Sequence, residues 1–155
     1  FQERFTCAEH YEGELAMLGD TLGADCHIIR QVDTPNGGTV SRSYRGDGLQ
    51  NEDWFTWREP VLAPVGGVVV FANDNAETNE VGVLGDPPPG GVLIRRDDAL
   101  MVVVAHLREL EVSQGDRVEA NNGTGRMPHV HLGAWRGETP YQLRFDLRAM
   151  GALME

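Results

Sequence analysis

The residues best suited to chemistry in this sequence are its histidines, and two of them stand close together. His129 and His131 flank Val130 in the segment Pro128-His129-Val130-His131-Leu132. Side chains two residues apart on a β-strand project to the same face, so we expect both imidazoles to point into one space. Such a pair suits a site in which one imidazole binds a metal ion and the other handles a proton.

Two further residues are candidates for the same site. His106 follows the apolar run 101–105, where a strand is expected to reach the rim of its sheet, and a packing role and a functional role both fit that position. Asp53 lies in a polar segment just before Trp54. A hydrolytic zinc site needs three protein ligands and one open position for water. His131 or His129 could give one ligand, and the carboxylate of Asp53 another.

The elements that would position these residues are short strands. From Cys26 onward, brief runs rich in β-forming residues alternate with Gly, Pro, Asn and Asp, which is typical of antiparallel sheets joined by turns. We therefore predict an all-β fold with an antiparallel sheet or sandwich core. Strands are predicted over residues 26–32, 67–73, 91–96, 100–107, 130–135 and 142–145. A short helix is predicted near the N-terminus, over residues 8–18, with Tyr11, Leu15 and Leu18 on one face.

The chain is expected to form one main domain. Its 155 residues suffice for a single buried core, and no repeat or shift in composition marks a boundary. We expect residues 1–25 to form an N-terminal cap or extension and residues 26–155 to form the domain itself. The segment 73–91, with three consecutive prolines, is long for a loop in a compact domain; the rim of a groove and a solvated excursion both fit it.

Composition and charge narrow the possible environments and partners. Aspartate and glutamate outnumber lysine and arginine by 24 to 13, and the net charge of −11 disfavours binding to nucleic acid. No apolar run is long enough to cross a bilayer as a helix. Cys7 and Cys26 would form one disulfide in an exported protein and would be two buried thiols in a cytosolic one.

Several short motifs together resemble the lysostaphin-type (LytM-like) zinc metallopeptidases, which cleave cross-link peptides of the bacterial cell wall. The motifs cover most of the chain from Asp25 to about Asp146, and each is common by itself, whereas their order and spacing are specific. They are the segments 25–33, 47–53, 59–69, 105–107, 115–118 and 128–132. The resemblance implies the all-β fold of that family, a duplicated hybrid motif, and an exported bacterial protein, either periplasmic or extracellular.

The resemblance also implies roles for individual residues. In such enzymes zinc is held by a histidine, an aspartate four residues later and the second histidine of a His-x-His pair. By position, Asp53 and His131 correspond to the last two ligands. His106 and His129 correspond to the catalytic histidines, which orient and polarise the water and stabilise the oxyanion.

The sequence departs from the family pattern at the first metal ligand. Leu49 stands four residues before Asp53, and its side chain has no lone pair to offer zinc. The nearest substitutes are Asp47, Glu52 and His27. Without a substitute, zinc is expected to bind weakly or not at all. A second departure is a shorter path from Val118 to His129, which leaves the local sheet order open.

Three functions therefore compete. The first is a zinc endopeptidase that acts on peptidoglycan peptides. The second is a non-catalytic, degenerate peptidase domain that binds cell wall or activates a partner hydrolase, and Leu49 favours it. The third is a plain β-barrel or sandwich binding module, which leaves the positions of Asp53 and the three histidines unexplained. Trp54, Trp57 and Trp135 would line a groove under the first two functions, or pack in the core.

Overall fold

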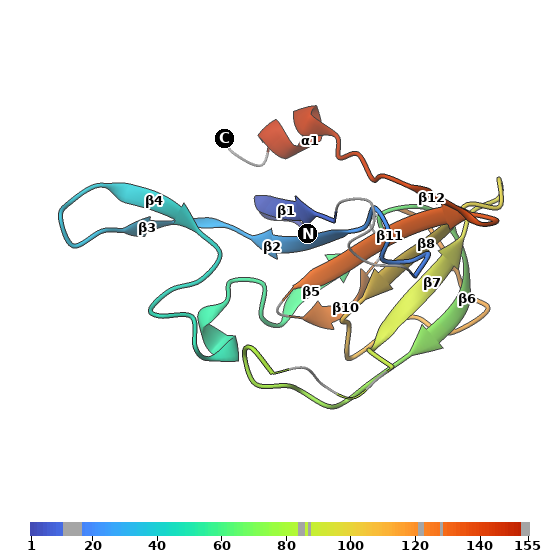
Figure 1. Cartoon of the computed structure of the whole chain (residues 1–155), viewed down its shortest axis with the longest axis horizontal. Coiled ribbons are helices and arrows are strands. Elements are labelled where there is room, and N and C mark those ends of the chain that lie inside the picture. Colours follow the sequence, from blue (N-terminus) through green and yellow to red (C-terminus); the bar gives the residue numbers. More distant parts are fainter. Residues whose placement is uncertain (11–16, 84–85, 87, 121–122, 128, 153–155) are drawn as a thin grey trace.

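The structure is a computed structural model that describes residues 1–10, 17–83, 86, 88–120, 123–127 and 129–152 (Figure 1). Its strands and its two short helices are β1 (Phe5–Glu9), β2 (Ala24–Ile28), β3 (Arg30–Asp33), β4 (Thr39–Arg42), a 3-10 helix (Asn51–Asp53), β5 (Glu59–Leu62), β6 (Gly67–Asn73), β7 (Gly91–Arg95), β8 (Met101–Ala105), β9 (Arg117–Val118), β10 (Gly123–Met127), β11 (Val130–Arg136), β12 (Thr139–Tyr141) and α1 (Leu147–Ala152). All strand pairs are antiparallel. The prediction of an all-β, antiparallel fold is confirmed.

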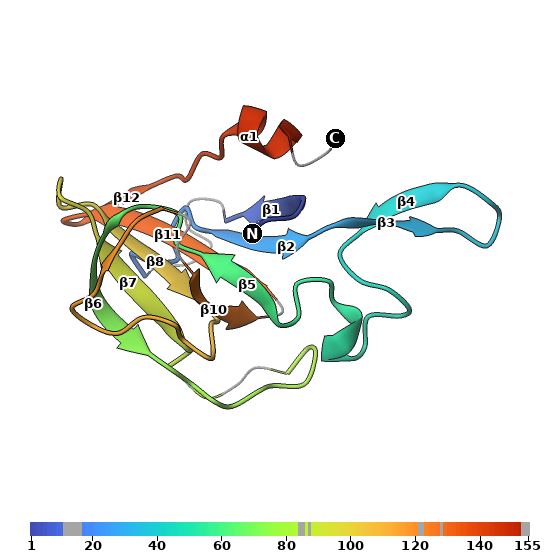
Figure 2. The ribbon, with the colours of Figure 1, turned by 180° about the vertical axis from the view of Figure 1, so that it is seen from behind.

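One large sheet carries most of the molecule. Its strands follow the order β1-β2-β11-β8-β7-β6-β9, and β12 adds to one end of β11. Strands β5 and β10 form a separate pair, and β3 and β4 form a hairpin that extends away from the rest in both views (Figures 1 and 2). The adjacent strands β2 and β11 are far apart in the sequence, and their pairing brings distant parts of the chain together.

The alternation of side chains divides this sheet into a core face and a polar face. In β2, Ala24, Cys26 and Ile28 are buried, while Asp25 and His27 between them point the other way and are half-buried. Because Cys26 lies opposite Val130 in β11, and Asp25 lies opposite His131, the two strands share the same division. The core face is completed by valines and isoleucine of β6, β7 and β8 and by Val61 of β5.

Two predicted elements are wrong. In the described part of the predicted helix 8–18, Ala8 and Glu9 belong to β1, and Met17 and Leu18 lie in a bend and turn; residues 11–16 lie outside the described residues. The full ladder of β1 with β2 outweighs the weak helical pattern there. The predicted strand 142–145 is irregular chain after β12. Its alternation reflects Leu143 and Phe145, which pack on the core without a strand partner.

Other boundaries also differ from the prediction. The predicted strand 26–32 is divided between β2 and β3, which belong to different sheets. The strands β1, β4, β5, β9, β10 and β12, the 3-10 helix and the helix α1 were not predicted. Strand β10 settles the open sheet order before His129, because it pairs with β5 and not with the large sheet. Within the described residues, no helix is long and apolar enough to span a membrane.

A disulfide joins the N-terminal segment to the centre of the fold. Cys7 of β1 and Cys26 of β2 are directly opposite in the ladder and are bonded to one another, 19 residues apart in sequence. Strand β1 forms the outer edge of the large sheet, so the N-terminal segment 1–25 is part of this sheet through β1 and the start of β2.

Removal of this disulfide should destabilise the protein. Closing a loop of this length lowers the entropy of the unfolded chain, so Cys7→Ala combined with Cys26→Ala should reduce the free energy of unfolding by about 3 kcal/mol. Urea unfolding measures it. The reduced wild type should lose a similar amount, and a double variant as stable as the oxidised protein would contradict the closed bridge.

Candidate functional site

All five histidines of the chain lie in one row across the polar face of the sheet. Neighbouring ring centroids are 5.2 Å apart for His10 and His131, 6.1 Å for His131 and His106, 4.5 Å for His106 and His129, and 5.5 Å for His129 and His27. The row comes from four pieces of the large sheet: the end of β1, β2, the end of β8, and β11 with the residue just before it. Strand pairing thus gathers residues more than a hundred positions apart.

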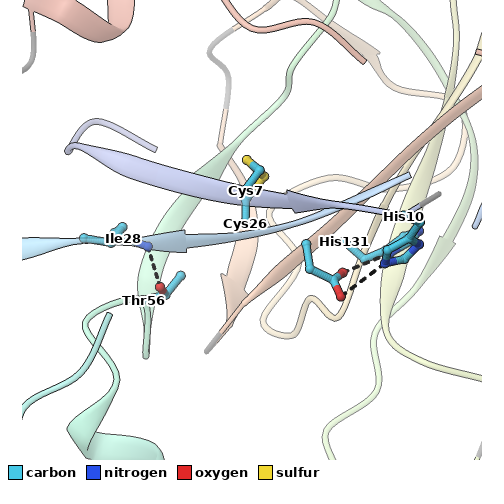
Figure 3. The surroundings of a disulfide bond; sticks show 7 residues. Cys7, His10, Cys26, Ile28, Thr56 and His131 are labelled. Atoms are coloured by element: carbon cyan, nitrogen blue, oxygen red, sulfur yellow. Dashed lines mark hydrogen bonds and ion pairs between the residues drawn. A yellow bond between two sulfur atoms is a disulfide. The ribbon is translucent and has the colours of Figure 1, made fainter. Parts of the chain in front are cut away.

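At one end of the row, three side chains form a possible metal site. Donor atoms of His10, Asp25 and His131 all lie within 4.8 Å of one another. The two oxygens of Asp25 divide the contacts, since Oδ1 lies 3.1 Å from Nδ1 of His131 and Oδ2 lies 3.4 Å from Nε2 of His10. Figure 3 shows His10 and His131 side by side, to the right of the disulfide. Two imidazoles and one carboxylate are ligand types that zinc prefers.

The other nitrogen of each ring faces a backbone carbonyl oxygen. His10 Nδ1 lies 3.0 Å from the carbonyl oxygen of Asp20, and His131 Nε2 lies 2.9 Å from that of Gly19. A carbonyl oxygen can only accept, so the N–H of each neutral ring is at these nitrogens. The lone pairs of both rings then face the carboxylate of Asp25, which also only accepts. Such an arrangement requires a proton or a cation between them, and ligands whose second nitrogen donates to a carbonyl are typical of metal sites.

Glycines bring the turn with these carbonyls close to the strand. A Cβ atom on Gly133 would collide with the Gly19 carbonyl oxygen, and one on Gly23 would lie 3.0 Å from the ring of His131. The turn is closed by bonds from the amides of Asp20 and Gly23, and Gly23 in turn accepts from the amide of His10. The absence of side chains at 23 and 133 therefore lets the turn orient both rings.

The charges in this group stabilise one another. Burial alone would raise the pKa of Asp25, but its hydrogen bonds with His131 and His10 and the nearby imidazoles hold it well below its usual range. Burial alone would lower the pKa of His131, but the contacts with Asp25, Gly19 and Asp20 outweigh it and raise this pKa. These contacts therefore favour the protonated form of His131, a residue that is only 5% exposed.

The rest of the row lines a groove of about 410 Å³. It is lined by His27, His106 and His129, by Trp54 and Trp57, and by residues of the segment between β6 and β7. The interpretation of segment 73–91 as the rim of a groove is confirmed for its described part. Trp54 and Trp57 line this groove, whereas Trp135 lies beside Gly19. A buried hydroxyl fixes the tryptophan turn, because Thr56 accepts from the amide of Ile28 at 2.8 Å (Figure 3).

His106 has an unusual backbone conformation. Its φ of 62° lies in the left-handed region, which costs a residue with a Cβ about 1 kcal/mol. The amide of the next residue, Leu107, donates to the carbonyl oxygen of Gly90. A Cβ atom on Gly90 would collide with the carbonyl oxygen of Leu107, so no side chain fits at position 90. Strain of this kind persists where surrounding contacts impose it, often at functional sites.

The structure thus brings together three of the four residues predicted for the site. His106, His129 and His131 belong to one row. Asp53 lies outside the three-residue group and does not line the groove; its Oδ2 accepts from the amide of Gln50, within its own turn. Leu49 is 66% exposed.

His10 and Asp25 were not predicted as site residues. Asp25 belonged to the first of the motifs on which the resemblance rests, and its place opposite His131 is the signal that reveals it. His10 lies 15 residues before Asp25, so no short spacing rule would connect them.

Comparison with solved structures gives relatives in fold. A chain in the crystal structure of the SpoIIIAH and SpoIIQ complex superimposes with a TM-score of 0.54 at 20% identity, over 90% of each chain. A chain of the SpoIIQ–SpoIIIAH pore-forming complex gives a TM-score of 0.50 at 19% identity, over 89% of this chain and 80% of that one. Csd3 from Helicobacter pylori, in its hexagonal crystal, gives 0.42 at 15% identity, over 94% and 50%, and supports no argument. At these identities the similarity concerns the fold alone. No family model and no curated protein matches the sequence.

Backbone strain at position 106 can be measured with two variants that both lack the imidazole. His106→Gly should be more stable than His106→Ala by about 1 kcal/mol, because glycine adopts a positive φ without the Cβ penalty. Urea unfolding of the two variants measures the difference. Equal stabilities would contradict the left-handed conformation of this residue.

Acid should destabilise the metal-free protein through His129. Burial, and then the neighbouring His106, lower the pKa of His129 to about 4. Between pH 6.5, the ordinary pKa, and about pH 4, His129 is protonated in the unfolded chain but neutral in the folded protein. The free energy of unfolding therefore falls as the pH falls through this range. His131, with a raised pKa, acts in a different window: its contribution is present below about 6.5 and is lost as the pH rises through the folded pKa.

Urea unfolding between pH 4 and 7, with a chelator present, measures this effect. In His129→Gln the loss of stability with acid should be smaller than in the wild type. An unchanged pH dependence would show that another group takes up the proton.

Proposed function

We propose that this protein is a zinc-dependent hydrolase of peptides, with His10, Asp25 and His131 as the metal ligands. The observation that carries this proposal is the arrangement of these three side chains, whose donor atoms lie within 4.8 Å of one another while backbone carbonyls accept from the remaining ring nitrogens. In this proposal Asp25 is the carboxylate ligand in place of Asp53, and His10 is the second histidine ligand. The site therefore needs no ligand at position 49, where the family pattern has a histidine and this chain has Leu49.

The residues present fit zinc by number and type. Catalytic zinc sites have three protein ligands, and two histidines with one carboxylate form one of the common sets. When bound, zinc supplies a water of lowered pKa and polarises a carbonyl oxygen. The second-nitrogen contacts of His10 and His131 hold the rings in the tautomers that leave a lone pair toward Asp25.

The neighbouring histidines are suited to orienting a water. His106 lies 6.1 Å from His131 and 4.5 Å from His129, measured between ring centroids, and both line the groove. Burial lowers the pKa of each, and for His129 to about 4, so that His129 is neutral near pH 7 and has a ring nitrogen lone pair with which to orient a water by a hydrogen bond. The groove beside them gives an extended peptide a place to lie.

The substrate and the location follow from the resemblance and the disulfide together. The motifs in the sequence resemble those of enzymes that cleave cell-wall peptides, so we propose peptidoglycan peptides as the substrate. A bond between Cys7 and Cys26 persists in an oxidising compartment, which supports an exported protein, periplasmic or extracellular.

A second candidate function is a non-catalytic domain that binds a partner protein or cell-wall peptide. It is favoured by two solved structures with a similar fold, since both are complexes of SpoIIQ with SpoIIIAH. In this case the group of His10, Asp25 and His131 would be a protonated ion-pair network, for which the raised pKa of His131 provides a basis.

Zinc binding separates these candidates and the two possible ligand sets. The wild type should bind one zinc ion per chain by isothermal titration calorimetry. Asp25→Asn and His10→Ala should each weaken binding by more than about 100-fold, because each removes a ligand. Asp53→Asn is the matched control and should change zinc affinity by less than about 3-fold.

Release of soluble peptides from purified cell wall then tests the reaction. Zinc-loaded wild type should release them, and His129→Ala should not, although it should still bind zinc. Loss of zinc binding in Asp53→Asn but not in Asp25→Asn would show that Asp53, and not Asp25, is the carboxylate ligand. A wild type that binds no zinc would favour the partner-binding candidate.

A further inference from the structure

We infer that the groove selects peptides with a positively charged, lysine-like side chain. This inference rests on the proposed function for its view of the peptide as a substrate. Its own basis is the composition of the groove, which combines an apolar wall and an acidic rim.

The rim is held in place at several points. Asn73 and Asn75 donate from their side chains to the carbonyl oxygens of Pro89 and Pro88, at 3.1 and 3.2 Å. Across the groove, Asn51 donates to the carbonyl oxygen of Asn79 at 2.9 Å. These contacts tie the described part of the segment between β6 and β7 to itself and to the turn that carries the tryptophans. The rim is therefore positioned well enough to recognise a ligand.

The charges of the groove are of one sign. Glu77, Glu80 and Asp86 line it, and the described lining residues include no arginine. Arg108 donates to the rim residue Thr78, but it already lies 3.8 Å from Glu109. Among the ion pairs of the described residues, none involves the three rim carboxylates. Their negative potential is available to a ligand.

Apart from these carboxylates, the lining of the groove is largely apolar. Trp54, Trp57, Val81 and Val83 all line the groove. A lysine-like side chain matches both features, since its carbon stem packs on apolar surface while its ammonium group reaches outward to carboxylates. A purely apolar side chain would leave the acidic rim unused, and an acidic one would be repelled by it.

The chemistry of the peptide can be varied without changing its shape. Three capped tripeptides serve as probes: acetyl-Ala-Lys-Ala-amide, the same peptide with norleucine, and the same peptide with glutamate. Norleucine replaces the amine of lysine by a methyl group. Binding is followed by the fluorescence of the tryptophans, with a chelator present so that hydrolysis does not occur.

The lysine peptide should bind about 10-fold more tightly than the norleucine peptide at low salt, which corresponds to a few exposed ion pairs acting together. The glutamate peptide should bind most weakly. High salt should reduce the preference, because the carboxylates of the rim are exposed. Equal binding of the lysine and norleucine peptides would overturn the inference.

Two triple variants test whether the local rim or the overall charge is responsible. Glu77→Gln with Glu80→Gln and Asp86→Asn should reduce the preference for lysine to less than about 3-fold. The control changes three exposed carboxylates that do not line the groove, Asp33→Asn, Glu111→Gln and Glu138→Gln, and should keep the preference. Loss of the preference in both variants would assign it to net charge and refute the rim as the cause.

Binding and hydrolysis fail independently in this design. A preference for the lysine peptide without any release of cell-wall peptides would refute the proposed hydrolase and leave the selective groove intact. Hydrolysis with no preference among side chains would refute only the selectivity.

Discussion

The pairing of β2 with β11 is the constraint on which the rest of the structure depends. It places Asp25 opposite His131, and one step along the same ladder it places Cys26 opposite Val130. The same few residues therefore bury the core on one face and assemble the polar row on the other. A shift of one position in this register would turn the carboxylate into the core and the cysteine toward the histidines, so packing and site chemistry are secured together.

Much of the fold could be predicted from the sequence, because strands with a buried face show the period of two. Strand β8, which ends just before His106, and strand β11, which contains His131, begin and end within two residues of the predicted bounds. The failures have a common cause. Strand β1 turns only Phe5 and Cys7 toward the core, an alternation too short to be recognised in the sequence, and it is held by a ladder and a disulfide. Residues 142–145 alternate because Leu143 and Phe145 pack on the core without a strand partner.

The site was harder to predict than the fold for a geometric reason. His106, His129 and His131 could be grouped because a strand end and a two-residue spacing bring them together. Asp53 was selected by its position in the motifs that resemble the metallopeptidase family, a pattern whose first ligand is replaced here by Leu49. Here the segment between His10 and Asp25 makes a turn that supplies the carbonyls of Gly19 and Asp20, so the relevant neighbours follow from sheet register and not from local spacing.

The contact between Gly133 and the turn around Gly19 has a consequence for related sequences. A backbone carbonyl occupies the space where a side chain at position 133 would stand, directly beside the ring of His131. Homologous proteins that orient this ring in the same way must therefore keep glycine two residues after the second histidine of the pair. Those with a larger residue there must have a different route for the N-terminal segment, and the His-Leu-Gly triplet becomes a marker that divides the two groups without any structure in hand.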